Sequence, residues 1–155
     1  MKFLIQKFLG IAKTVEPCAQ YGVLLFLRIM IGWTFFLTGK GKLAHFDRTT
    51  HFFESLHIPA PAFHAGLVGG LEMIGGLLLI AGLCTRLISV PLLISMIVAY
   101  LTAESDGFAS IYDFTQKAPF IYLCVTLVTL TFGPGKFSLD ALIARRLASS
   151  RSGGK

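Results

Sequence analysis

Charged residues are scarce in this sequence. Of its 155 residues, 14% are charged and 54% are hydrophobic, whereas soluble domains carry about 25% charged residues. The apolar residues are gathered into long runs, so the composition excludes an ordinary soluble core. The length allows one compact unit, which we place at residues 1–148, and leaves no room for a second domain. Residues 149–155 are expected to form a disordered tail.

Cysteines and catalytic motifs are equally sparse. The three cysteines, Cys18, Cys84 and Cys124, form no CxxC pair. They therefore exclude a disulfide framework or a zinc site, and they disfavour thiol-redox chemistry that needs a close pair. The sequence contains no GxGxxG, Walker loop, GxSxG or pair of catalytic carboxylates. We assign no catalytic residue and no metal site. Whether the chain is an enzyme stays open, and an accessory oxidoreductase subunit is favoured over a stand-alone enzyme.

Four apolar stretches predict four transmembrane helices. They cover about residues 21–43, 63–83, 87–103 and 118–132. A span needs about 20 apolar residues to cross about 30 Å of hydrocarbon, so the fourth is short. The second and third are separated only by Cys84-Thr85-Arg86, which predicts an antiparallel hairpin. The expected fold is an all-α integral membrane bundle in the lipid bilayer.

Both ends of the chain have the pattern of an amphipathic helix. Residues 1–15 place apolar side chains at helical spacing opposite Lys2 and Lys13, which is typical of a helix lying in the headgroup region. Near the other end, Ser138 is a good N-cap for a second such helix, with Asp140 in its first turn. We expect both helices to be interfacial. The outer loop, residues 40–62, is expected to be partly helical.

The distribution of basic residues predicts the orientation of the chain. The net charge is +6, but the basic residues flank apolar spans and form no stripe that would bind nucleic acid. Nine of them fall on the side of the two termini and Arg86, and four on the other side. The positive-inside rule then places both termini in the cytoplasm of a multi-pass protein.

Two formal charges lie within spans, Arg28 in the first and Glu72 in the second. Each shares a helix face with small residues that allow close helix contact. Counted from the ends of their spans, Arg28 lies about 10 Å deep and Glu72 about 16 Å deep from the same side. We predict an interaction between them, direct or through water. It is either a structural ion pair or a polar site for a ligand, a proton or a cofactor headgroup.

Other ionisable residues are weaker candidates. Lys42 lies at the outer end of the Arg28 face, where it either snorkels to the interface or contacts an anion or a quinone head. Glu104 and Asp106 end the third span and are either solvated acids or part of a cleft mouth. Four histidines also fall on the outer side, and they could bind a metal or haem only if the loop folds them together. They are His45, His51, His57 and His64.

A series of short motifs resembles the DoxX family in its order along residues 22–143. The motifs are RIMIG at 28–32, GKGKL at 39–43, FFESLHIPAP at 52–61, LVGGLEMIGG at 67–76, LCTRL at 83–87, GF at 107–108 and FGPGKFSLD at 132–140. The resemblance implies a four-helix protein of the bacterial inner membrane with its family positions at Arg28, Glu72 and Lys42. Many relatives carry a histidine before the Gly-Phe pair, where this chain has Glu104-Ser105-Asp106.

The resemblance also implies a link to redox processes. Some relatives are membrane subunits of a thiosulfate:quinone oxidoreductase, and others are thought to join superoxide- or thiol-handling complexes. Our first hypothesis is a membrane subunit or accessory of such a redox system, with a partner subunit and quinone as the cofactor. The second is a small-solute or proton-coupled transporter, which would form a homodimer through its glycine-rich faces. The third is a non-catalytic membrane scaffold.

Overall fold

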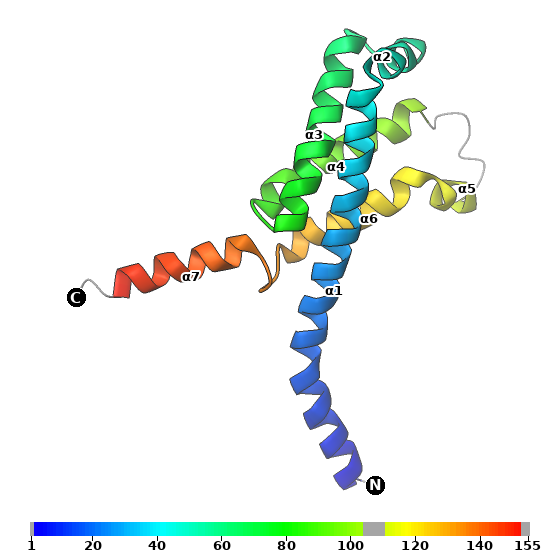
Figure 1. Ribbon diagram of the computed structural model, residues 1–155. Coiled ribbons are helices and arrows are strands. Elements are labelled where there is room, and N and C mark those ends of the chain that lie inside the picture. The colour runs from blue at the N-terminus through cyan, green and yellow to red at the C-terminus, as the bar shows by residue number, and fades with distance from the viewer. Residues whose placement is uncertain (1, 104–110, 153–155) are drawn as a thin grey trace.

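The described parts of the chain fold into helices. The computed structural model describes residues 2–103 and 111–152, and all elements in these ranges are α-helices (Figure 1). In chain order they are α1 (Lys2–Ala44), α2 (Phe46–Ser55), α3 (Pro61–Ala81), α4 (Thr85–Ala103), α5 (Ile111–Gln116), α6 (Ala118–Phe132) and α7 (Leu139–Ser152).

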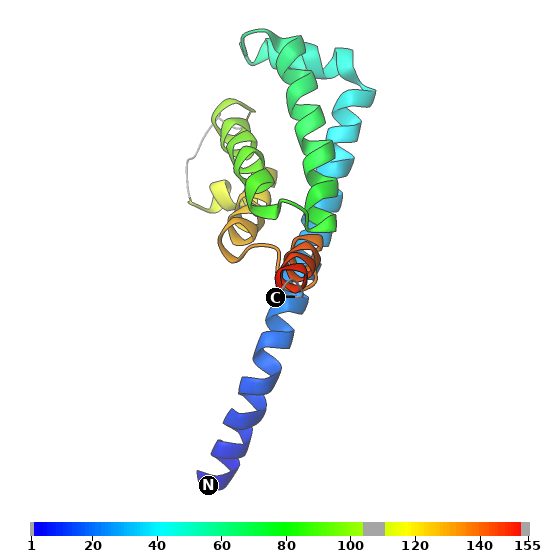
Figure 2. The ribbon, with the colours of Figure 1, turned by 90° about the vertical axis from the view of Figure 1, so that its left-hand side faces the viewer.

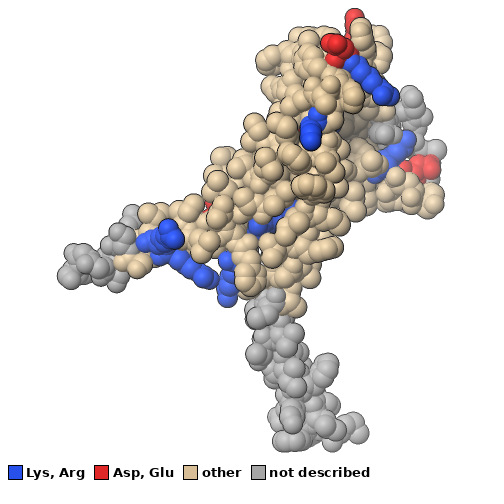
Figure 3. All heavy atoms as spheres, viewed as in Figure 1, with Lys and Arg blue, Asp and Glu red and all other residues tan. Residues whose placement is uncertain are grey.

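Among the described residues, three helices are long and apolar enough to cross a membrane: the Ala19–Ala44 part of α1, and the whole of α3 and α4. The fourth apolar helix, α6, has 15 residues. These helices lie where the sequence predicts spans. Large apolar side chains are exposed along them, Leu87 by 75% and Phe63 by 65%, as expected for side chains that face lipid. In Figure 3 the middle of the visible face is mostly uncharged, and charged residues gather towards its two ends.

The helices are arranged as two pairs. α1 packs along α3, and α4 packs along α6; Figure 2 shows the pairs close together at one end and apart at the other. Gly32 and Gly76 bring α1 and α3 together, because a Cβ on Gly32 would lie 2.7 Å from the Gly76 carbonyl oxygen. α4 and α6 are joined by a hydrogen bond of 3.0 Å between the hydroxyls of Ser89 and Thr129. We call the end of the molecule where α2 lies the α2 end, and the opposite end, near Arg28, the Arg28 end.

The buried apolar core lies between the two pairs. It contains one cluster of side chains from α1, α3, α4 and α6: Ile31, Phe35, Leu79, Leu92, Met96 and Val125. The ring of Phe35 meets that of Tyr122 edge-on, with centroids 4.8 Å apart. The core thus joins the two helix pairs on the Arg28 side of the point where they diverge.

Two expectations about the chain ends need correction. The N-terminal amphipathic segment is not a separate helix, because α1 runs without a break from Lys2 to Ala44. Amphipathic and apolar residues share the same helical period, so the change of composition does not end the hydrogen-bond ladder. The expected disordered tail begins too early, because α7 continues to Ser152. The Ser138 hydroxyl accepts from the backbone N–H of Ala141 at 3.1 Å, which confirms the predicted N-cap.

Candidate functional site

Arg28 is buried at the end of α3 and does not pair with Glu72. Its side chain is 1% exposed. Its Nε donates to the Leu79 carbonyl at 3.0 Å and its Nη2 to the Ile80 carbonyl at 3.3 Å. Its Nη1 donates to the carbonyls of Pro134 and Phe137 in the α6–α7 connection. The guanidinium therefore binds backbone oxygens of two segments far apart in the sequence.

The predicted Arg28–Glu72 pair is wrong because of the register between α1 and α3. The two small-residue faces do pack together as expected, with Gly32 opposite Gly76 and Gly39 opposite Gly69. In this antiparallel register, Arg28 lies opposite Leu79, seven residues beyond Glu72, which is about 10 Å along a helix. There it meets the last carbonyls of α3, of which that of Leu79 also accepts the N–H of the cap residue Gly82 at 3.1 Å, and the carboxyl end of a helix attracts positive charge.

Asp140 binds the start of α4 at this end of the molecule, a role that its position in the sequence does not predict. Its carboxylate accepts from the backbone N–H of Cys84 at 2.9 Å and of Thr85 at 3.2 Å, at the start of α4. Its own N–H donates to the Gly82 carbonyl at 3.1 Å. We call this cluster the Arg28 junction: Arg28, residues 79–85 and residues 134–140. It ties the ends of α3 and α6 to the starts of α4 and α7.

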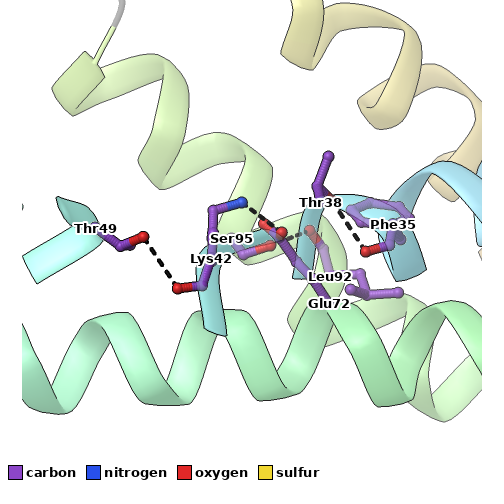
Figure 4. A network of polar contacts seen from close by, with 7 residues as sticks. All are labelled: Phe35, Thr38, Lys42, Thr49, Glu72, Leu92 and Ser95. Atoms are coloured by element: carbon purple, nitrogen blue, oxygen red, sulfur yellow. Dashed lines mark hydrogen bonds and ion pairs between the residues drawn. The ribbon is translucent and has the colours of Figure 1, made fainter. Parts of the chain in front are cut away.

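Glu72 is instead paired with Lys42. The Lys42 Nζ lies 2.5 Å from Glu72 Oε2, as the close-up in Figure 4 shows. The Glu72 side chain is 2% exposed and that of Lys42 is 29% exposed. The simple snorkelling interpretation of Lys42 therefore does not hold. Breaking a buried ion pair leaves an uncompensated charge and typically costs about 3–5 kcal/mol, so each residue depends on the other.

The ion pair lies in the wall of a cavity between the two helix pairs. The cavity has a volume of about 530 Å³, and its lining includes Phe52 and Phe53 of α2. Its lining is mostly apolar and comes from α3, α4 and neighbouring elements, including Leu67, Leu71, Pro91, Ile94 and Val98. Such a volume with few polar groups is typical of a small-molecule site.

Two hydroxyls also line the cavity near the ion pair. Thr38 donates to the Phe35 carbonyl at 3.0 Å, and Ser95 donates to the Leu92 carbonyl at 2.9 Å. Figure 4 shows Thr38 on α1 and Ser95 on α4 near Glu72 and Lys42. Both hydroxyl protons are engaged by the backbone, so the oxygens present acceptor lone pairs to the cavity. These two residues had no recognisable signal in the sequence, where any membrane helix can carry such hydroxyls.

The remaining candidates are dispersed. Glu104 and Asp106 lie outside the described residues. His64 lines the apolar cavity, while His45 lines a second, smaller pocket, and the His51 imidazole lies 3.5 Å from Glu54. Within residues 2–103 and 111–152, no three His, Cys, Asp or Glu side chains gather in a way that could hold a metal ion.

The fold and the cavity define a class: a multi-helix membrane protein that holds one ion pair in the wall of an apolar cavity. The comparison with known families is consistent with that class. The DoxX family model matches residues 23–105, and the chain belongs to the DoxX family.

The relatives are bacterial proteins matched over most of their length. A Haemophilus influenzae protein, named only as uncharacterized, is 33% identical over 143 residues, which cover 84% of this chain and 93% of the relative. An uncharacterized membrane protein of Mycobacterium tuberculosis is 31% identical over 131 residues, or 77% and 80% of the two chains. The Bacillus subtilis protein named "Putative oxidoreductase CatD" is 32% identical over 126 residues, or 80% and 88%. No solved structure gives a significant match.

Proposed function

We propose that this chain is a membrane subunit of a redox system, and that it binds a quinone in the apolar cavity with the quinone head at Lys42 and Glu72. The observation that carries the proposal is the position of the ion pair, at the wall of a cavity of about 530 Å³ that is otherwise mostly apolar. Membership of the DoxX family and a relative named as an oxidoreductase support the redox assignment.

The chemistry of the pair suits both oxidation states of a quinone. A quinone carbonyl accepts hydrogen bonds, and the Lys42 ammonium can donate one. A quinol hydroxyl donates, and the Glu72 carboxylate can accept and then hold its proton. The isoprenoid tail would lie against the apolar wall formed by residues such as Leu67, Ile94 and Val98. Lysine and glutamate side chains do not carry electrons, so in this proposal a partner subunit supplies or removes them.

The same proposal places the chain in the bacterial inner membrane with four spans and both termini in the cytoplasm. The Asp140 contacts with Cys84 and Thr85 bring the start of α7 beside the start of α4. If α4 crosses the membrane, α5 and α6 must return the chain to the same side. α7 then lies along the interface, since Leu142, Ile143 and Leu147 are exposed on it beside Arg145 and Arg146.

Photolabelling tests the proposed quinone site. The protein would be reconstituted in lipid nanodiscs with an azidoquinone that carries a decyl tail, and the labelled peptides would be mapped by mass spectrometry. We expect label on α3 and α4, competed by ubiquinone. The double variant Lys42→Met/Glu72→Leu removes the charges together, which is often neutral for stability, and should lose at least tenfold in labelling. Lys40→Met, an exposed lysine on the same helix, is the matched control.

The outcomes separate redox binding from the other hypotheses. Equal labelling of wild type and the double variant, or label confined to surfaces away from α3 and α4, would refute the quinone site. A transporter for a polar solute is less well supported, because a polar solute would have to pass the apolar wall of the cavity at a desolvation cost. If the protein is a scaffold, the double variant should lose the ion pair and should otherwise behave as wild type.

A further inference from the structure

A second pocket lies beside the ion pair at the α2 end and carries positive charge. It has a volume of about 380 Å³ and lies where α1 passes into α2. The residues that line it are Gly41, Lys42, His45, Arg48, Thr49, Phe52 and Phe53. Lys42, Phe52 and Phe53 also line the apolar cavity, so the two spaces share a wall.

The local backbone holds the basic groups around this pocket. Thr49 ties the end of α1 to α2, because its hydroxyl lies 3.1 Å from the Lys42 carbonyl and 3.0 Å from the His45 carbonyl. His45 is the N-cap residue of α2, and its side chain makes no capping hydrogen bond. The imidazole therefore stays available to a ligand. Lys42 near the end of α1, His45 at the turn and Arg48 in the first turn of α2 all line the pocket.

The charges around the pocket are not balanced. Within the described part of the chain, Arg48 makes no ion pair, and Lys42 is paired only with Glu72. Asp47 lies in the first turn of α2 but is exposed and does not line the pocket. Arginine binds phosphate in a bidentate way, and lysine serves as a point charge beside it. An anion in the pocket would thus meet an unpaired arginine, a lysine and a histidine.

We propose that this outer pocket binds a phosphate-type anionic group, either the headgroup of an anionic phospholipid or a free phosphate. The bound anion contacts Arg48 and His45 and shares Lys42 with Glu72. Its position suits a headgroup, because the pocket lies where the apolar part of α1 ends, and Phe52 and Phe53 of its lining continue into the apolar cavity. This proposal stands whether or not a quinone occupies the cavity.

Lipid retention and phosphate binding test this site together. The full-length protein would be reconstituted in nanodiscs with phosphatidylglycerol or with phosphatidylcholine, and retained lipid would be counted by native mass spectrometry. Inorganic phosphate would be titrated separately by calorimetry. We expect wild type to retain phosphatidylglycerol or to bind phosphate. The variants Arg48→Gln and His45→Gln should each weaken that binding about tenfold, as one lost hydrogen bond to a charged group predicts.

Lys40→Gln removes an exposed lysine that does not line the pocket and should leave binding unchanged. Retention of phosphatidylglycerol alone assigns a lipid headgroup, and binding of phosphate alone assigns a free ion. Wild type that binds neither, or Arg48→Gln and Lys40→Gln variants that bind equally well, overturns the proposal. The Lys42→Met/Glu72→Leu variant removes one contact of the anion but leaves Arg48 and His45 in place. It should therefore weaken anion binding without abolishing it, and quinone labelling can fail while anion binding survives.

Discussion

At the residue scale, Arg28 uses its charge to join segments rather than to form an ion pair. It reaches carbonyls at the end of α3 and in the α6–α7 connection. Hydrogen bonds to a charged group each contribute about 1.5–3 kcal/mol, and several of them share this one guanidinium. The residue that looked most like half of an active site is therefore better explained as the centre of the Arg28 junction.

A lysine cannot replace Arg28, because an ammonium lacks the planar fork that reaches carbonyls on both sides. We expect Arg28→Lys to lower the free energy of unfolding by about 3 kcal/mol, the loss of two charged hydrogen bonds. Denaturant unfolding in detergent would measure it. Arg86→Lys is the control, since Arg86 makes one exposed hydrogen bond of 3.3 Å to the Thr131 carbonyl. Equal effects of the two substitutions would contradict the role of Arg28.

Gly82 is the second residue on which the Arg28 junction depends. It ends α3 with φ +67, and a Cβ there would lie 2.5 Å from Arg28 Nη2 and 2.6 Å from Ser138 Cβ. We expect Gly82→Ala to destabilise the protein by at least about 1–2 kcal/mol from the left-handed backbone alone, with a further steric loss. Thermal unfolding would show it. Gly41→Ala should be neutral or slightly stabilising, because nothing lies within 4 Å of a Cβ on Gly41.

At this scale the sequence predicts the contacts that a residue makes with its neighbours along the chain, but not those that it makes with another helix. The Ser138 cap follows from its neighbours along the chain, and it is confirmed. The pairing of Glu72 with Lys42 depends on the register of two helices and on how far each span extends. The depth of a residue within its span does not reveal that register. The depth argument therefore pairs Glu72 with the wrong basic residue.

At the element scale, α1 and α3 approach each other at glycines opposite the ion pair. A Cβ on Gly39 would lie 2.6 Å from the Gly69 carbonyl oxygen and 2.9 Å from the Glu72 carbonyl carbon. These are backbone atoms, so the helices themselves would have to separate. Gly39→Ala should cost about 1–3 kcal/mol, as overpacking usually does, and should displace Glu72.

Gly70 offers a matched control for Gly39. It lies on α3, and a Cβ there would meet nothing within 4 Å. Gly70→Ala should leave the melting temperature in detergent unchanged or raise it, while Gly39→Ala lowers it. If both glycines tolerate alanine equally, the close contact between α1 and α3 is not what positions Glu72.

The predictability of the elements follows the strength of their periodic signal. The apolar runs located α3, α4 and α6 closely, and the aromatic loop was correctly expected to contain a helix, α2. The continuous α1 was missed, because a change from amphipathic to apolar composition resembles a boundary without breaking the helix. The short α5 was also missed, since six residues carry too little pattern to distinguish a helix from a loop.

At the scale of the whole molecule, the polar ties are concentrated at one end and the cavity lies towards the other. Arg28 and Asp140 connect the two helix pairs at the Arg28 end, while the pairs diverge towards α2 (Figure 2). No sequence pattern records the angle between two packed pairs, so the cavity could not be foreseen. It places Glu72 and Lys42 in one wall and brings Ser95 of α4 to the same space.

The last prediction concerns how this molecule crosses the membrane. α6 spans about 22 Å at the usual rise per residue, short of about 30 Å of hydrocarbon, so its crossing needs direct proof. Cys84 is exposed on the α3–α4 turn, and Ser149 is exposed on α7. In single-cysteine proteins, a membrane-impermeant maleimide should label Cys84 and a Ser149→Cys variant only after spheroplasts are lysed. An Arg48→Cys variant should be labelled on intact spheroplasts. If Ser149→Cys is labelled on intact spheroplasts while Cys84 is protected, α6 does not cross the membrane. If Cys84 and Ser149→Cys are both labelled on intact spheroplasts and Arg48→Cys only after lysis, the orientation is the opposite one.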